Sequence, residues 1–202
     1  IADVTGLLQR GMTEKGLLDY KKQLADYLKT QDGAKSYDLD FNARQSLPDN
    51  LYDINDKFYG NNNVIGSKDK ESHGTHVAGI IAAERNNGLG VNGVAENVEI
   101  MVLRAVSTAD EYDKDIAKAI RYAADNGAKV INTSFGKSYS PHAKWVYDAI
   151  KYAADHDVLI VNAAGNDGTD LDTKNIYPND QVDNGAEISD NFLTVGALNY
   201  KY

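Results

Sequence analysis

The chain has 202 residues, which suits one domain with a substantial hydrophobic core. Its 21 Lys and Arg residues are outnumbered by 30 Asp and Glu residues, and the net charge of −9 argues against a nucleic-acid partner, because such a partner requires a basic surface. The absence of cysteine excludes a disulfide framework and a thiol nucleophile, and no apolar run is long enough to span a bilayer.

Residues 1–60 differ in pattern from the rest of the chain. We predict an amphipathic helix over Glu14–Gln31, because its leucines fall on one face and its Lys, Asp and Gln residues on the other. A turn-rich stretch follows, from Pro48 to Asn63. We therefore divide the chain into a helical and turn-rich segment, residues 1–60, and a more regular part, residues 61–202.

The regular part alternates predicted helices with short apolar strands. The predicted helices are Ser72–Arg85, Asp113–Asp125 and Ala143–His156, and the predicted strands are Val98–Leu103, Lys129–Phe135, Val158–Val161 and Phe192–Ala197. This alternation indicates an α/β fold with a parallel sheet that helices cover on both faces. Ligands of such sheets bind at the carboxyl ends of the strands, where two unusual segments lie, Asn132–Gly136 and Asn162–Gly168.

The segment Ser72–Gly79 places a histidine at the start of a helix, with a serine as the predicted N-cap. Gly74 and Gly79 each cost about 1 kcal/mol in a helix relative to alanine. Because helix propensity does not favour them, we expect that they permit close approach of another backbone. His73 is a candidate general base that would need a carboxylate partner, and a capped helix with an unused histidine is the alternative. Zinc binding is disfavoured. In the zinc-protease motif the two histidines lie four residues apart and a glutamate follows the first, whereas His73 and His76 lie three residues apart with no glutamate between them.

Four further features lie in predicted loops or at strand ends. The run Gly88–Gly93 matches a dinucleotide-binding fingerprint, but it follows a helix and precedes a strand, so we interpret it as a turn. A structural calcium ion near Asn87 is a hypothesis that needs oxygen ligands from elsewhere. Asn166 is placed to donate to a developing oxyanion, with an Asn-Gly-rich turn as the alternative. Ser134 lacks the flanking glycines of a nucleophile elbow, so we interpret it as backbone that pairs with an extended ligand.

Three motifs, in this order and spacing, resemble those of the subtilisin-like serine proteases: His73–Gly79, Val130–Gly136 and Ala163–Gly168. The resemblance runs from about Asn63 to Tyr202. It implies a three-layer α/β/α fold with a mostly parallel sheet. It also implies a serine endopeptidase that acts on extended peptide or protein substrates and is extracellular or in the cell envelope. The approach to the histidine, Phe58–Asn62, resembles that of large subtilases of Bacteroidetes.

The resemblance also implies roles for particular residues. The first histidine of the family's motif is the general base, which here is His73, and the asparagine after Ala-Ala-Gly donates to the oxyanion hole, which here is Asn166. The substrate-binding residues that it implies are Ser134, Phe135 and Gly136 on one side of the cleft, and Ala163, Ala164 and Gly165 on the other.

Two parts of the family's pattern have no match in the sequence. The triad aspartate of the family lies in an Asp-Ser-Gly or Asp-Thr-Gly turn, to which Asp3–Gly6 comes nearest, but without a preceding apolar strand. The nucleophile lies in a Gly-Thr-Ser-Met-Ala type segment, which is absent. We therefore expect a subtilisin-like fold that is incomplete at both ends, with residues 1–60 as an insertion before the histidine motif. We also expect no peptide hydrolysis by these residues alone, and self-association through exposed apolar surface.

Two alternatives and one question of specificity stay open. A pseudoenzyme or peptide-binding module that keeps the substrate groove without the triad is the main alternative, and a nucleotide-binding α/β domain is a more distant one. Asp167 next to the oxyanion asparagine would favour basic side chains near the scissile bond, and Lys137 would offset that preference.

Overall fold

The computed structural model describes residues 13, 15, 22, 47–69, 71–106 and 111–198. The chain divides into two compact units, Ile1–Ser46 and Leu47–Tyr202, and the boundary that we place between residues 60 and 61 stays a prediction. The helix predicted over Glu14–Gln31 lies outside the described residues, apart from Lys15 and Lys22, which are helical. Among the described residues, no helix has the length and apolar character that crossing a membrane requires.

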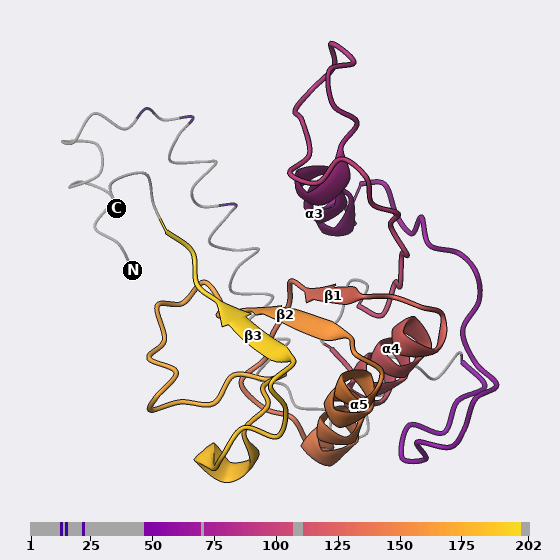
Figure 1. Ribbon diagram of the computed structural model, residues 1–202, viewed down its shortest axis with the longest axis vertical. Coiled ribbons are helices and arrows are strands. Elements are labelled where there is room, and N and C mark those ends of the chain that lie inside the picture. Colours follow the sequence, from indigo (N-terminus) through magenta and orange to yellow (C-terminus); the bar gives the residue numbers. More distant parts are fainter. Residues whose placement is uncertain are drawn as a thin grey trace. The chain divides into compact units, whose positions relative to one another are not determined.

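The second unit contains a parallel three-stranded sheet in the order β1-β2-β3. The strands are β1 (Val130–Thr133), β2 (Leu159–Ala163) and β3 (Phe192–Val195), and a 3-10 turn, η1 (Val182–Asn184), precedes β3. Helices α4 (Asp113–Asp125) and α5 (Ala143–Asp155) pack against each other on one face of the sheet (Figure 1). The α/β fold with a parallel sheet is thus confirmed, and α4 has the predicted bounds.

The core lies between α4, α5 and the sheet. Ile116, Ile120 and Ala124 of α4 repeat at helical spacing, so they form one apolar stripe that faces the core. On α5, Ala149 and Ala153 are 0% exposed. Their small side chains let the backbones of α4 and α5 approach closely. The buried cluster consists of Ile116, Ala117, Ile120, Ala124, Val146, Ala149, Ile150, Ala153, Val158, Ile160 and Phe192.

The strand predicted over Val98–Leu103 is wrong, because these residues form no strand. A strand is held by hydrogen bonds to a neighbour, and none of the three strands of the described sheet pairs with this run. Val98, Ile100, Met101 and Val102 stay between 41% and 51% exposed. The Gly88–Gly93 run, by contrast, lies outside helices and strands, with bends at residues 88–90, which agrees with its interpretation as a turn.

Candidate active site

The two segments that the sequence singles out at strand ends lie at one edge of the sheet. The parallel register places Thr133, the last residue of β1, opposite Asn162 of β2. Ser134–Gly136 therefore leaves the sheet next to Ala163–Gly165. On the other side of β2, the amide of Ala164 donates to the carbonyl of Val195 in β3 over 2.9 Å. The structure thus brings together the residues predicted to bind the substrate from both sides.

A buried polar network lies directly beneath this edge. The Thr133 hydroxyl donates to Asn162 Oδ1 over 2.7 Å, and the Asn162 amide donates to the carbonyl of Pro178 over 3.1 Å. Thr133 and Asn162 are 3% and 2% exposed, so these hydrogen bonds are shielded from water and fix the ends of the two strands relative to each other. Both residues lie in the segments that the sequence singles out, but the sequence assigned neither of them a role, although polar side chains within apolar strand runs were a usable signal.

Asn166 follows β2 after a turn that glycine makes possible. Gly165 has a φ of +95°, a left-handed conformation that side chains with a Cβ rarely adopt. The turn leaves Asn166 exposed to solvent near the carboxyl edge of the sheet. An exposed, uncharged amide donor at this place is the group that oxyanion stabilisation requires, and its role stays a prediction.

The segment after β1 is held from several sides. Asn132 donates to the Ser134 hydroxyl over 2.8 Å, and the half-buried Phe135 packs against the hydrophobic core. A Cβ built on Gly136 would lie 3.2 Å from Ile176 Cγ2, so a larger residue at this position would press on its neighbour. These contacts hold the backbone of Ser134–Gly136 in one place, which is what pairing with an extended peptide needs.

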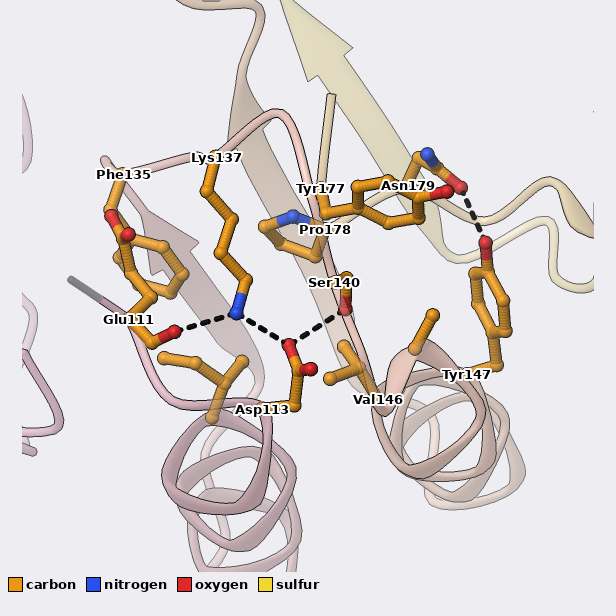
Figure 2. A pocket seen from close by; sticks show the side chains of 12 residues that line it. Glu111, Asp113, Phe135, Lys137, Ser140, Val146, Tyr147, Tyr177, Pro178 and Asn179 are labelled. Carbon is orange, nitrogen blue, oxygen red and sulfur yellow. Dashed lines mark hydrogen bonds and ion pairs between the residues drawn. The ribbon is translucent and has the colours of Figure 1, made fainter. Parts of the chain in front are cut away.

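Lys137, the next residue, points toward α4. Its ammonium lies 2.7 Å from Asp113 Oδ1 and donates to the main-chain carbonyl of Glu111 over 2.6 Å (Figure 2). The charge of Lys137 is thus paired with Asp113, and whether Lys137 offsets the charge of Asp167 stays open.

His73 begins α3 (His73–Ala82), and its side chain is exposed. Ser72 occupies the N-cap position but makes no side-chain cap hydrogen bond, because its φ of −92° and ψ of −16° are helical rather than extended. None of the residues of α3 is buried, and within the described part of the chain α3 does not pack on the sheet, α4 or α5. Within the described part of the chain, no hydrogen bond or ion pair joins His73 to Asn166, and the role of His73 stays a prediction.

The glycines of α3 do not have the close neighbours that we expected. A Cβ on Gly74 or Gly79 would meet no atom within 4 Å. The close approach occurs instead at Gly93, where a Cβ would lie 2.4 Å from the backbone nitrogen of Ala83. There the segment Gly93–Ala95 donates three backbone hydrogen bonds to the carbonyls at the end of α3, which caps the helix.

Among the described residues, no group of three or more His, Cys, Asp or Glu residues is placed to hold a metal ion. Asn87 Oδ1 accepts the amide of Leu89 over 2.9 Å, so this oxygen is used within its own loop. The calcium ion near Asn87 stays a prediction.

Residues 25–201 match the model of the subtilase family. A cell wall-associated protease of Bacillus subtilis (strain 168) is 46% identical over 88 residues, 43% of this chain and 10% of that protein. A thermophilic serine proteinase of Bacillus sp. (strain AK1) is 54% identical over 69 residues, 34% of this chain and 17% of that protein. The solved structure of sphericase matches with a TM-score of 0.54 and 30% identity, covering 70% of this chain and 43% of that one. The chain thus matches each of these relatives over less than half of their length.

Proposed function

Because the chain belongs to the subtilase family, we propose that the whole protein is a serine endopeptidase that hydrolyses peptide bonds with a Ser-His-Asp triad. The observation that carries this proposal is the family match over residues 25–201, which includes the motifs of His73 and Asn166. The geometry of the sheet edge also supports this proposal. A cleft for an extended substrate needs two walls, and Ser134–Gly136 and Ala163–Gly165 lie next to each other at one edge of the sheet.

Each proposed residue has a distinct task in this chemistry. His73 takes the proton of the serine hydroxyl as the oxygen attacks the scissile carbonyl, and then delivers it to the leaving amine. The amide of Asn166 donates to the oxyanion that forms on that carbonyl. Ser134, Phe135 and Gly136 pair with the substrate backbone, and Ala163, Ala164 and Gly165 form the opposite wall.

The 202 residues contain no Gly-Thr-Ser segment and no Asp-Ser-Gly or Asp-Thr-Gly turn. We therefore propose that these residues alone do not hydrolyse peptides and that the whole protein supplies the aspartate and the serine. The exposed position of α3 agrees with a histidine that lacks its carboxylate partner.

The test compares the full-length protein with the 202-residue chain. A fluorophosphonate probe should label the serine of the full-length protein and leave the chain unlabelled, whereas stoichiometric labelling of the chain would contradict its proposed inactivity. In the full-length protein, His73→Ala should abolish peptide hydrolysis, while His76→Ala, on the same exposed helix, should retain most of it. Asn166→Ala should lower kcat by about 10²–10³-fold, a magnitude taken from the matching donor of subtilisin.

The pseudoenzyme alternative makes a different prediction for the same experiment. The absence of matches to the aspartate and serine motifs is what favours it. A full-length protein that binds extended peptides but resists the probe and cleaves no peptide would identify a peptide-binding module.

We further propose that the 202-residue chain associates with a second copy of itself. Val130, Leu193 and Val195 of the sheet are 58%, 50% and 51% exposed, and edge strands with apolar side chains favour pairing between chains. Light scattering should show a dimer or larger species, which Leu193→Lys should shift toward the monomer. A monodisperse monomer of the unmodified chain would contradict this proposal.

The location of the protein is also a proposal. One relative is named as cell wall-associated, and we infer that this protein is likewise extracellular or in the cell envelope. Immunoblots of culture medium, envelope and cytosol from the producing cells test this, and a purely cytosolic signal would contradict it.

A further inference from the structure

Lys137 and Asp113 form the centre of a buried polar cluster behind the proposed substrate strand (Figure 2). Asp113 is the first residue of α4, and its two oxygens accept from three groups of one loop. Oδ1 accepts from the Lys137 ammonium and the Ser140 hydroxyl, each over 2.7 Å, and Oδ2 accepts from the His142 amide over 2.8 Å. One carboxylate thus organises the whole loop that follows Gly136.

The backbone of Lys137 is fixed as firmly as its side chain. Its amide donates to the carbonyl of Tyr177 over 2.9 Å, and the Tyr177 amide donates back over 2.8 Å. Lys137 therefore ties three parts of the chain together at the residue directly after Gly136: the substrate strand, the segment before cis-Pro178, and the start of α4.

The cluster has no room for a ligand. The cavity among its side chains measures about 10 Å³, which holds at most a water molecule. Phe135 and Tyr177 line the same cavity, so the cluster packs directly behind the residues proposed to meet the substrate. Its groups serve one another rather than a bound molecule.

The charges of the pair are largely removed from water. The side chains of Lys137 and Asp113 are 17% and 3% exposed, so removal of either one leaves the other charge with poor solvation. Lys144 and Asp148 on α5 form a pair of the same chemistry, but their side chains are 81% and 50% exposed. This pair contributes little to stability, because water already solvates both charges. The chain thus offers a matched control.

We propose that Lys137 and Asp113 are positioning residues that hold Ser134–Gly136 in the conformation that pairs with an extended substrate. The proposal rests on the proposed function and goes beyond it, because neither residue touches the substrate. The buried ion pair transmits the position of α4 to the substrate strand, so its loss lets the strand shift, and small displacements of a binding strand are costly to catalysis.

The test uses the full-length protein with two substrates. A tetrapeptide amide can pair with the whole of the proposed substrate strand, whereas a single-residue ester can pair with it through one residue at most. Lys137→Met should lower kcat/KM for the tetrapeptide by about ten- to hundred-fold, mainly through KM, and for the ester by much less. Lys137→Arg, which keeps a cation within reach of Asp113, should recover much of the loss. Lys144→Met should behave as the unmodified protein on both substrates.

Several results would overturn the proposal. Equal losses on both substrates would indicate a purely structural role, and tetrapeptide hydrolysis by Lys137→Met at the unmodified rate would indicate no role. A change in preference between acidic and basic substrate side chains would instead place Lys137 in the cleft. If Lys137→Met does not fold, Asp113→Asn/Lys137→Met, which leaves no buried charge of the pair, takes its place. Failure of that variant to fold would also mean a structural role.

A second measurement separates this proposal from the proposed function. If the unmodified protein cleaves neither substrate, the proposed function fails, and amide hydrogen exchange alone decides the positioning role. Lys137→Met should then exchange the backbone amides of position 137 and of Tyr177 at least about ten-fold faster, because the two hydrogen bonds that these amides donate to each other's carbonyls open more often. Unchanged exchange would overturn the positioning role.

Discussion

Lys114 is a fully buried charge in the described structure, and its substitution tests how the segment before the histidine is held. It is 1% exposed, and its ammonium contacts Asp49 Oδ1 and donates to the carbonyl of Asn50 over 2.7 Å. It also lies 3.4 Å from Asp56 Oδ2 and 4.4 Å from the ring centre of Tyr59. One lysine of α4 therefore anchors residues 49–59.

Lys114→Met removes the cation and keeps most of the side-chain volume. The Asp49 side chain is 0% exposed, so its carboxylate would stay buried without that ammonium. Breaking a buried pair in this way costs about 3–5 kcal/mol, a large part of a typical stability of about 5–15 kcal/mol. Asp49→Asn/Lys114→Met should cost less than the single substitution, because it removes both charges. Lys144→Met, on the exposed pair with Asp148, should cost at most about 0.5 kcal/mol.

Urea unfolding followed by fluorescence measures these differences. Trp145 is the sole tryptophan of the chain and packs against the hydrophobic core, so it reports the unfolding of that core. Limited proteolysis within residues 47–59 reports local opening of the anchored segment. If Lys114→Met matches Lys144→Met in both assays, or if the double variant costs more than the single one, the reasoning about the buried pair is refuted.

Three further predictions concern pH and backbone packing. Burial raises the pKa of Tyr147 from 10.0 to about 12, so its contribution to stability is complete below about pH 10 and is lost as the pH rises toward about 12. Urea unfolding across this range should show the loss, and Tyr147→Phe should remove it. The backbone amides of Asn50 and Phe58 lower the pKa of Asp56 from 3.8 to about 2, so the stabilisation that it gives is present above about pH 4 and is lost as the pH falls toward about 2. An NMR titration of Asp56 should give this low midpoint, and a midpoint near 3.8 would contradict it. Gly93→Ala should destabilise the end of α3 by about 1–3 kcal/mol, because its Cβ would lie 2.4 Å from a backbone atom, whereas Gly79→Ala, with open space around it, should stabilise the helix by about 0.4–1 kcal/mol. Amide exchange along α3 measures both.

The sequence was sufficient for most of the fold of the second unit. The helix over Asp113–Asp125 has the predicted bounds, and β1, β2 and β3 lie within one or two residues of their predicted positions. These elements carry strong apolar periodicity and clear stop signals such as Asn126-Gly127, and such signals are local. The strand over Val98–Leu103 failed because an apolar run becomes a strand only beside a neighbour that shares its hydrogen bonds, and no local pattern supplies one.

The candidate site divides in the same way. Its motifs predict the residues of both cleft walls, and the parallel register places these residues at one edge of the sheet. The pairing of Lys137 with Asp113 and of Thr133 with Asn162 could not be predicted, because each joins residues from different elements. The sequence offered Lys137 only as a charge near the cleft.

The sequence by itself determined the family, most of the elements and the residue types of the candidate site, because motifs, helical spacing and apolar runs act over a few neighbouring residues. Only the tertiary structure decided which charges are shielded from water and by which partner. The strength of an ion pair depends on how far packing removes it from solvent, and packing is set by contacts between distant parts of the chain. Lys137 shows the difference, because its sequence neighbours suggest a group facing the substrate, whereas its fold gives it a buried partner on α4.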